Sequence, residues 1–152
     1  MRFPRRRNIW IFIVAAIIVI FGGLIVWGLV TTTNMVALAN EFSPPTGSTK
    51  IGEAITRPTP LCWGGRTCPS VFRSWESSET IDNSILADLV KNSGWALNQE
   101  GDCGPGQNIR TLGLICSASG LVDGFWITIN VVAPITSQSR GTVSLDLNSM
   151  IP

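Results

Sequence analysis

The chain has 152 residues, enough for one membrane segment and one small domain. Only 14% of the residues are charged, and four of the eleven basic ones lie within the first seven positions (Arg2, Arg5, Arg6 and Arg7). The seven basic residues that remain are outnumbered by ten acidic ones and form no cluster, which excludes nucleic acid as a partner because that affinity depends on phosphate neutralisation.

A long apolar run follows the basic tail of residues 1–8. The segment from Ile9 to Val30 has 22 residues without a charge. As a helix it would span about 33 Å, slightly more than the hydrocarbon core of a bilayer. Trp10 and Trp27 lie near its two ends, where indole rings prefer the headgroup region. The pattern predicts one transmembrane helix over residues 9–30.

The charge distribution also predicts the orientation of this helix. Four arginines precede the run, and the first charge after it is Glu41. The positive-inside rule therefore places the N-terminus in the cytoplasm and the C-terminus outside the plasma membrane. The sequence contains no Asn-x-Ser/Thr sequon, which favours a bacterial envelope over a eukaryotic secretory route.

The alternative to a retained anchor is a cleaved signal peptide. Ala37-Leu38-Ala39 satisfies the small-x-small rule for cleavage after Ala39. The apolar run is longer than the usual hydrophobic region of a signal peptide, and nine residues separate its end from the cleavage position. These features favour a retained anchor and leave cleavage as the second interpretation.

Residues 31–60 are predicted to be a linker. The part from Ser43 to Pro60 mixes Pro, Gly, Ser and Thr, a composition typical of an extended tether. The short stretch from Lys50 to Thr56 has an alternative interpretation as an edge strand.

Residues 61–152 are predicted to form the extracytoplasmic domain. Ile81, Ile85, Leu86, Leu89 and Val90 recur at helical spacing, and Gly94 is suited to end that helix. Strands are expected at Ser70–Glu76, Trp95–Asp102, Ile109–Ala118, Gly124–Val132 and Thr142–Leu147. Turns are expected at Gly104–Gly106, Ser119–Gly120 and Asp123–Gly124. The order predicts a small α+β domain with one helix on a mostly antiparallel sheet, stapled by disulfides.

Four cysteines lie on the outer side: Cys62, Cys68, Cys103 and Cys116. An even number in an oxidising compartment indicates two disulfides, for which three pairings exist. We favour Cys62–Cys68, which closes a small loop, and Cys103–Cys116, which would staple adjacent strands. Redox and zinc roles are disfavoured, because the spacing is not C-x-x-C and a zinc site would compete with oxidation.

No residue pattern indicates catalysis, a metal or a cofactor. The chain lacks histidine, which removes Ser-His-Asp and Cys-His chemistry and the commonest metal ligand. The carboxylates near the predicted helix are interpreted as solvated surface (Glu76, Glu79, Asp82 and Asp88). The sequence predicts a protein that is not an enzyme.

Tryptophans are the most suggestive residues of the domain. Trp75, Trp95 and Trp126 fall in predicted elements and are expected in the core. Trp63 lies in the Gly-rich cysteine loop next to Arg66 and is hard to bury there, so this pair is the candidate for a partner contact.

These observations predict a membrane-anchored, non-enzymatic interaction or accessory module of the cell envelope. Its expected partners are the lipid bilayer and a membrane or envelope protein. The alternative is a secreted or surface module that binds a ligand or glycan and is released by cleavage after Ala39.

Overall fold

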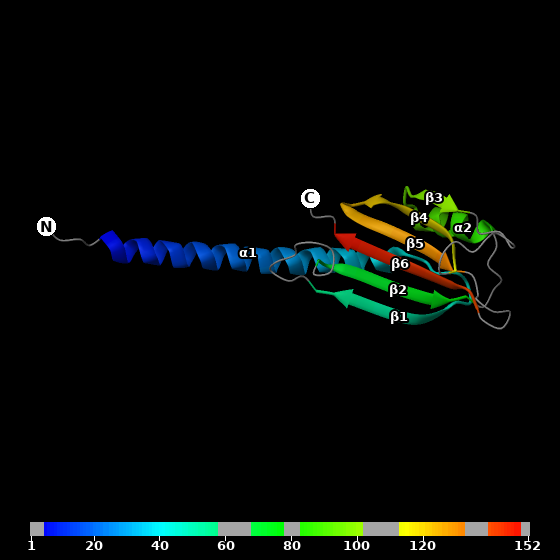
Figure 1. Cartoon of the computed structure of the whole chain (residues 1–152), viewed down its shortest axis with the longest axis horizontal. Coiled ribbons are helices and arrows are strands. Elements are labelled where there is room, and N and C mark those ends of the chain that lie inside the picture. Colours follow the sequence, from blue (N-terminus) through cyan, green and yellow to red (C-terminus); the bar gives the residue numbers. More distant parts are fainter. Residues whose placement is uncertain (1–4, 58–67, 78–82, 102–112, 133–139, 150–152) are drawn as a thin grey trace.

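The computed structural model describes residues 5–57, 68–77, 83–101, 113–132 and 140–149. They form one long N-terminal helix, α1 (Arg5–Glu41), a six-stranded antiparallel sheet and a second helix, α2 (Asn83–Ser93). The first part of α1 projects away from the sheet, and its last turns lie alongside it (Figure 1). The predicted combination of a long apolar helix with a small α+β domain is therefore present.

Helix α1 continues eleven residues beyond the predicted end of the membrane segment. Three threonine hydroxyls donate hydrogen bonds to carbonyl oxygens four residues earlier, from Thr31, Thr32 and Thr33 to Trp27, Gly28 and Leu29. Met35, Leu38, Ala39 and Phe42 then recur at offsets 0, 3, 4 and 7, and all four are buried. Because this apolar stripe packs on the sheet, the helix persists where a linker was expected.

The predicted linker is replaced by helix and strand over most of its length. After α1, a short turn leads into β1 (Thr49–Thr56), the edge strand that the sequence left open for residues 50–56. This strand is antiparallel to β2 (Ser70–Glu76), whose bounds match the prediction. The Pro- and Gly-rich composition of residues 43–48 fits a tight reversal of the chain and not a long tether.

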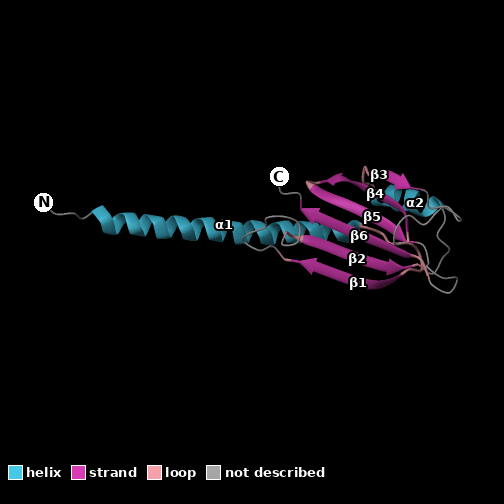
Figure 2. Cartoon of the chain, in the orientation of Figure 1, coloured by secondary structure: helices cyan, strands magenta, loops and turns pink. Residues whose placement is uncertain are grey.

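The strands are arranged in the order β1-β2-β6-β5-β4-β3 (Figure 2). The remaining members are β3 (Asn98–Gly101), β4 (Leu114–Val122), β5 (Phe125–Val132) and β6 (Thr142–Ser149). Every pairing is antiparallel. Two-residue alternation gives the sheet an inner face that packs against both helices and an outer face on the opposite side.

The core lies on the inner face. Its largest contributions come from β2, β5 and β6, which supply eight apolar side chains that are at most 6% exposed: Val71, Trp75, Ile127, Ile129, Val131, Val143, Leu145 and Leu147. Helix α2 adds Leu86 and Leu89, and Gly94 ends it at φ +71°, as the sequence predicts. The end of α1 completes the same cluster of buried residues.

Two sequence predictions about β4 were wrong. The strand is displaced towards the C-terminus of its predicted range, and Ser119–Gly120 lies inside it, not in a turn. A Cβ at Gly120 would lie 3.0 Å from the carbonyl oxygen of Ala96. This glycine therefore marks a close approach of two backbones.

The Asp123–Gly124 turn is confirmed. Both residues have positive φ, 50° and 82°, and they join β4 to β5 as a two-residue hairpin. Positive φ at both central positions is the property of a type I′ turn, for which Asp-Gly is a preferred sequence.

Candidate functional site

The junction between α1 and the sheet is centred on one side chain, Arg73 in the middle of β2. Its Nη1 donates to the carbonyl oxygen of Ala39 at 2.8 Å, and its Nη2 donates to Oδ1 of Asn40 at 2.8 Å. Its Nε donates to Oε1 of Glu53 on β1 at 2.7 Å. The Arg73 side chain is only 11% exposed, so it is a cation enclosed between three elements.

The position of this cation suits the end of a helix. The last carbonyl groups of an α-helix have no partner within the helix and carry the negative end of its dipole. Arg73 satisfies one of these groups, at Ala39, and brings a positive charge to it. Helix α1 is thus fixed to the sheet by directional bonds as well as by packing.

A lysine extends the same network. The Nζ atom of Lys50 lies 2.6 Å from Oε2 of Glu53, and the other carboxylate oxygen of Glu53 accepts the hydrogen bond from Arg73. The hydrogen bond from Lys50, and then that from Arg73, hold the pKa of Glu53 below its ordinary value of 4.5. Glu53 is therefore ionised at neutral pH and bridges both cations.

Aromatic packing closes the junction on the side farther from the membrane segment. Phe42 follows the last residue of α1, and its ring centroid is 5.2 Å from that of Trp75 and 6.1 Å from that of Trp95. Trp75 and Trp95 are buried, as predicted from the sequence. The three rings join α1, β2 and the segment after α2 into one hydrophobic unit.

The outer face of the sheet is mostly polar. The cross-strand row nearest the β4–β5 turn contains Ser70, Asn148, Trp126 and Leu121. The next row contains Phe72, Asp146, Thr128 and Ser119. Three of these eight side chains are large, apolar and well exposed: Phe72 at 38%, Trp126 at 37% and Leu121 at 58%.

The expectation that Trp126 belongs to the core was wrong. Ile127, Ile129 and Val131 occupy the inner face of β5, so Trp126 has the opposite parity and lies on the outer face. A strand rich in β-branched and aromatic residues does not by its composition reveal which parity is buried.

Asp146 is a titratable group in the second of these rows. Asn148 donates a hydrogen bond of 3.0 Å to its Oδ1. Desolvation by burial raises the pKa of Asp146 above its ordinary value of 3.8, and the bond from Asn148 opposes that rise.

The carboxylates that were interpreted as solvated surface are located only in part. Glu76 lies 3.5 Å from Arg140, an exposed ion pair, and Asp88 is exposed on α2. Glu79, Asp82 and Asp102 lie outside the described residues. Among the described His, Cys, Asp and Glu side chains, no group of three or more is placed to hold a metal ion.

Two of the six predicted disulfide and contact residues, Cys68 and Cys116, lie among the described residues. Among the described residues there is no free cysteine: Cys68 and Cys116 are both disulfide-bonded, and no disulfide has both of its cysteines there. Cys62, Cys103, Trp63 and Arg66 lie outside the described residues. The pairing of the cysteines and the contact role of Trp63 and Arg66 stay predictions.

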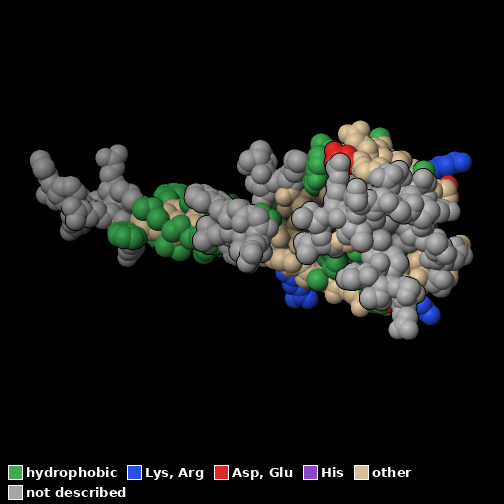
Figure 3. Space-filling view, turned by 45° about the vertical axis from the view of Figure 1, so that its right-hand side comes forward, with side chains coloured by type: hydrophobic (Ala, Val, Ile, Leu, Met, Phe, Trp, Pro, Cys, Tyr) green, Lys and Arg blue, Asp and Glu red, His purple; other side chains and the backbone are tan. Residues whose placement is uncertain are grey.

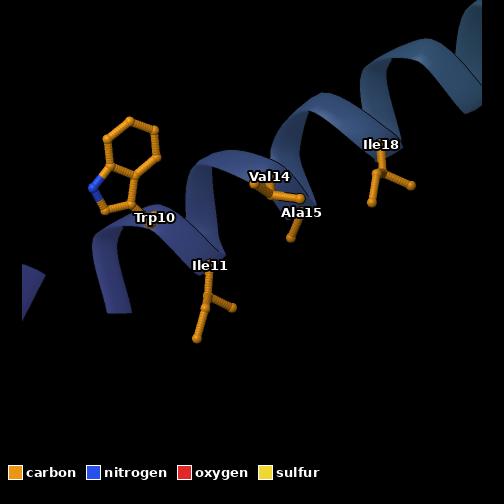
Figure 4. A pocket seen from close by; sticks show the side chains of 5 residues that line it. All are labelled: Trp10, Ile11, Val14, Ala15 and Ile18. Carbon is orange, nitrogen blue, oxygen red and sulfur yellow. The ribbon is translucent and has the colours of Figure 1, made fainter. Parts of the chain in front are cut away.

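A shallow hollow occurs on the membrane segment. It is lined by Trp10, Ile11, Val14, Ala15 and Ile18, all from neighbouring turns of α1 (Figure 4). On the face seen in Figure 3, hydrophobic side chains cover most of the visible part of α1, whereas the coloured Lys, Arg, Asp and Glu side chains lie over the domain. The hollow is the kind of surface that lipid chains fill, not a polar ligand site.

The chain matches no protein-family model, no curated protein and no solved structure. The junction and the outer face must therefore be interpreted from their own geometry.

The roles of Arg73 and Phe42 were not predicted from the sequence. The spacing of Met35, Leu38, Ala39 and Phe42, which is that of an amphipathic helix, was the available signal for the extension of α1.

Proposed function

We propose that the chain is a single-pass plasma-membrane protein with a cytoplasmic N-terminus and an outer sheet domain. In this proposal it acts as a non-enzymatic interaction or accessory module of the cell envelope. The observation that carries the proposal is the junction at Arg73, because it makes the end of the apolar helix a structural part of the domain. Within the described residues, α1 is the one helix long and apolar enough to cross a membrane.

The junction favours a retained anchor over a cleaved signal peptide. Cleavage after Ala39 would break the peptide bond whose carbonyl oxygen accepts from Arg73. It would also remove Met35, Leu38 and Ala39, which are at most 5% exposed, from the core. Losing two large buried side chains costs about 2–5 kcal/mol each, which is comparable to the total stability of a small domain.

The predicted disulfides also fit an outer location. Cys116 lies opposite Gly101 across the β3–β4 ladder, and Cys103 follows Gly101 by two residues in the sequence. This register supports the proposed Cys103–Cys116 pair, and Cys62–Cys68 remains the proposed second pair. Stable disulfides are typical of extracytoplasmic compartments.

Membrane fractionation of the full-length protein tests the anchor. The proposal expects the chain to remain in the membrane after a carbonate wash and its N-terminal peptides to be found by mass spectrometry. Protease added outside intact spheroplasts should digest the domain. A soluble product that starts at Asn40 would contradict the proposal.

Co-purification from mild detergent tests the accessory role. A C-terminally tagged chain should bring down a defined membrane or envelope protein, and the amount should fall for Arg73→Ala, which disturbs the junction. Arg140→Ala, at an exposed ion pair, is the matched control. A protein that is recovered alone under several mild conditions would count against an accessory role.

A further inference from the structure

We infer that the β4–β5 hairpin end of the domain rests on the bilayer surface, with Leu121 and Trp126 in the layer between headgroups and acyl chains. This inference depends on the proposed retention of α1 as the anchor. It adds a second membrane contact, made by the sheet, to the one made by the helix.

The chain direction places the hairpin towards the membrane. Helix α1 and strand β2 run in the same direction, because Ala39 and Phe42 contact Arg73 and Trp75, respectively. Strand β6 is antiparallel to β2, β5 to β6 and β4 to β5, so β4 ends and β5 begins at the end of the sheet nearest the apolar stretch of α1. Figure 1 shows the start of β5 and the end of β4 at that end.

The Ala39–Arg73 contact gives the height of this end above the apolar run of α1. Nine residues of helix separate Ala39 from Val30, the last residue of the run, and they span about 13.5 Å. Three residues of strand separate Arg73 from Ser70, which is in the same cross-strand row as Trp126 and Leu121, and they span about 10 Å. The row therefore lies about 4 Å above the end of the apolar run. The headgroup layer is about 5–8 Å thick on each side of the hydrocarbon core, so the row lies within it.

The chemistry of the row matches that layer. Leu121 and Trp126 are directly opposite each other across β4 and β5, and they are 58% and 37% exposed. An indole ring is favoured at the membrane interface because its ring is apolar and its N–H can hydrogen-bond to headgroups. Arg57, which follows β1 at the same end of the sheet, is exposed as well, and its guanidinium suits lipid phosphate.

The exposed apolar side chains of the domain are concentrated at this same end of the sheet. The domain exposes five large ones within its described residues: Ile51, Ile55, Phe72, Leu121 and Trp126. All but Ile51 lie within the three residues of their strand that are nearest the membrane end. The edge strand β3 pairs with β4 from Ser119 to Cys116, farther from the membrane end than Leu121. It is exposed and has the polar sequence Asn-Gln-Glu-Gly. A soluble ligand surface would have no reason to be biased towards the anchor.

Quenching of tryptophan fluorescence by lipid tests the inference. The full chain is reconstituted in phosphatidylcholine–phosphatidylglycerol vesicles containing a lipid with a nitroxide on its headgroup. The Trp126 contribution is the difference between the native protein and Trp126→Phe. A matched control adds Ile51→Trp to the Trp126→Phe protein, which places an indole at an exposed site near the opposite end of β1.

We expect the Trp126 contribution to be quenched at least about twofold more than that of the indole at position 51. Equal, weak quenching of both would overturn the inference. So would a Trp126 emission that responds to soluble cell-wall oligosaccharide but not to the labelled lipid, because the row would then be a ligand surface.

Failure of the anchor proposal has a different signature. Trp10 and Trp27 lie in α1, and their contribution is the difference between the Trp126→Phe protein and one that also carries Trp10→Phe and Trp27→Phe. If that contribution shows no quenching by the labelled lipid, then α1 is not in the bilayer, and both proposals fail. If it is quenched while the Trp126 contribution is not, only the surface contact is overturned.

Discussion

The guanidinium of Arg73 on β2 donates a hydrogen bond of 2.8 Å to the main-chain carbonyl oxygen of Ala39, in the last turn of α1. This bond joins a residue in the middle of β2 to the end of the long apolar helix. With the bonds from Arg73 to Asn40 and Glu53, it makes the helix and the domain one folded unit.

Arg73→Ala should therefore strongly destabilise the protein. It removes three charge-assisted bonds from a site that is 11% exposed and leaves Glu53 with only Lys50 as its partner. We expect a loss of about 3 kcal/mol in the free energy of unfolding, measured by denaturant titration in detergent micelles. Arg140→Ala should cost less than about 0.5 kcal/mol, because its ion pair with Glu76 is exposed. Equal effects of the two substitutions would show that Arg73 does not fix the junction.

Leu38→Ala tests whether the end of α1 belongs to the core. Leu38 is 5% exposed, and its truncation should lower the free energy of unfolding of the domain by about 2–5 kcal/mol. Leu29→Ala removes the same atoms from a side chain that is 57% exposed in the membrane segment, so the domain should unfold as before. An unchanged free energy of unfolding in Leu38→Ala would show that the end of α1 does not belong to the core of the domain.

Gly52→Ala should be destabilising through a single contact. A Cβ at Gly52 would lie 2.6 Å from Oγ of Ser74 on the neighbouring strand. We expect a cost of about 1 kcal/mol, measured as a shift of the unfolding midpoint. In a Ser74→Ala background the hydroxyl is gone, so most of the cost of Gly52→Ala should disappear. An unchanged cost in that background would assign it to strand propensity instead.

Asp146→Asn should stabilise the domain at neutral pH. Burial raises the pKa of Asp146, so the folded state binds its proton more tightly than the unfolded state. The ionised form therefore destabilises the fold at pH values above the folded pKa, and protonation removes this effect as the pH falls. The asparagine can still accept from Asn148. Urea titrations should show the gain at neutral pH and none below the ordinary value of 3.8. A gain that persists in acid would exclude this cause.

Peptide mapping of the unreduced protein should recover the pairs Cys62–Cys68 and Cys103–Cys116. Because each closes a short loop, reduction should lower the free energy of unfolding by about 2–4 kcal/mol per disulfide, measured by denaturant titration with and without reductant. Serine substitution of Cys103 should leave Cys116 reactive to a thiol reagent in the unfolded protein, whereas substitution of Cys62 should not. A Cys62–Cys116 link would refute the proposed pairing.

Much of the fold could be predicted from local sequence. The run from Ile9 to Val30 is apolar on every side, which leaves few alternatives to a membrane helix. Strands β2, β5 and β6 were placed within two residues of their bounds, since turn residues flank them and their composition is typical of strands. Gly94 ended α2 as predicted because only its backbone readily adopts positive φ.

The candidate site could not be predicted to the same extent, because it depends on contacts between distant residues. Nothing near Arg73 in the sequence indicates that its guanidinium meets Ala39, thirty-four residues earlier. The outward position of Trp126 depends on which parity of β5 meets the helices, and both parities of that strand include apolar residues. The displacement of β4 also depends on distant residues, since Gly120 pairs with Ile127 on β5, and a side chain at this position would meet the backbone of Ala96.

The unbroken course of α1 limits the space in which the domain can meet other molecules. If α1 is retained in the membrane as proposed, the domain follows the lateral movement, rotation and tilt of its helix and cannot swing about a flexible joint. Its longest described strand has nine residues, so in that arrangement it would extend about 30 Å above the bilayer. A membrane-bound partner would then meet the domain within this layer, by diffusion in two dimensions.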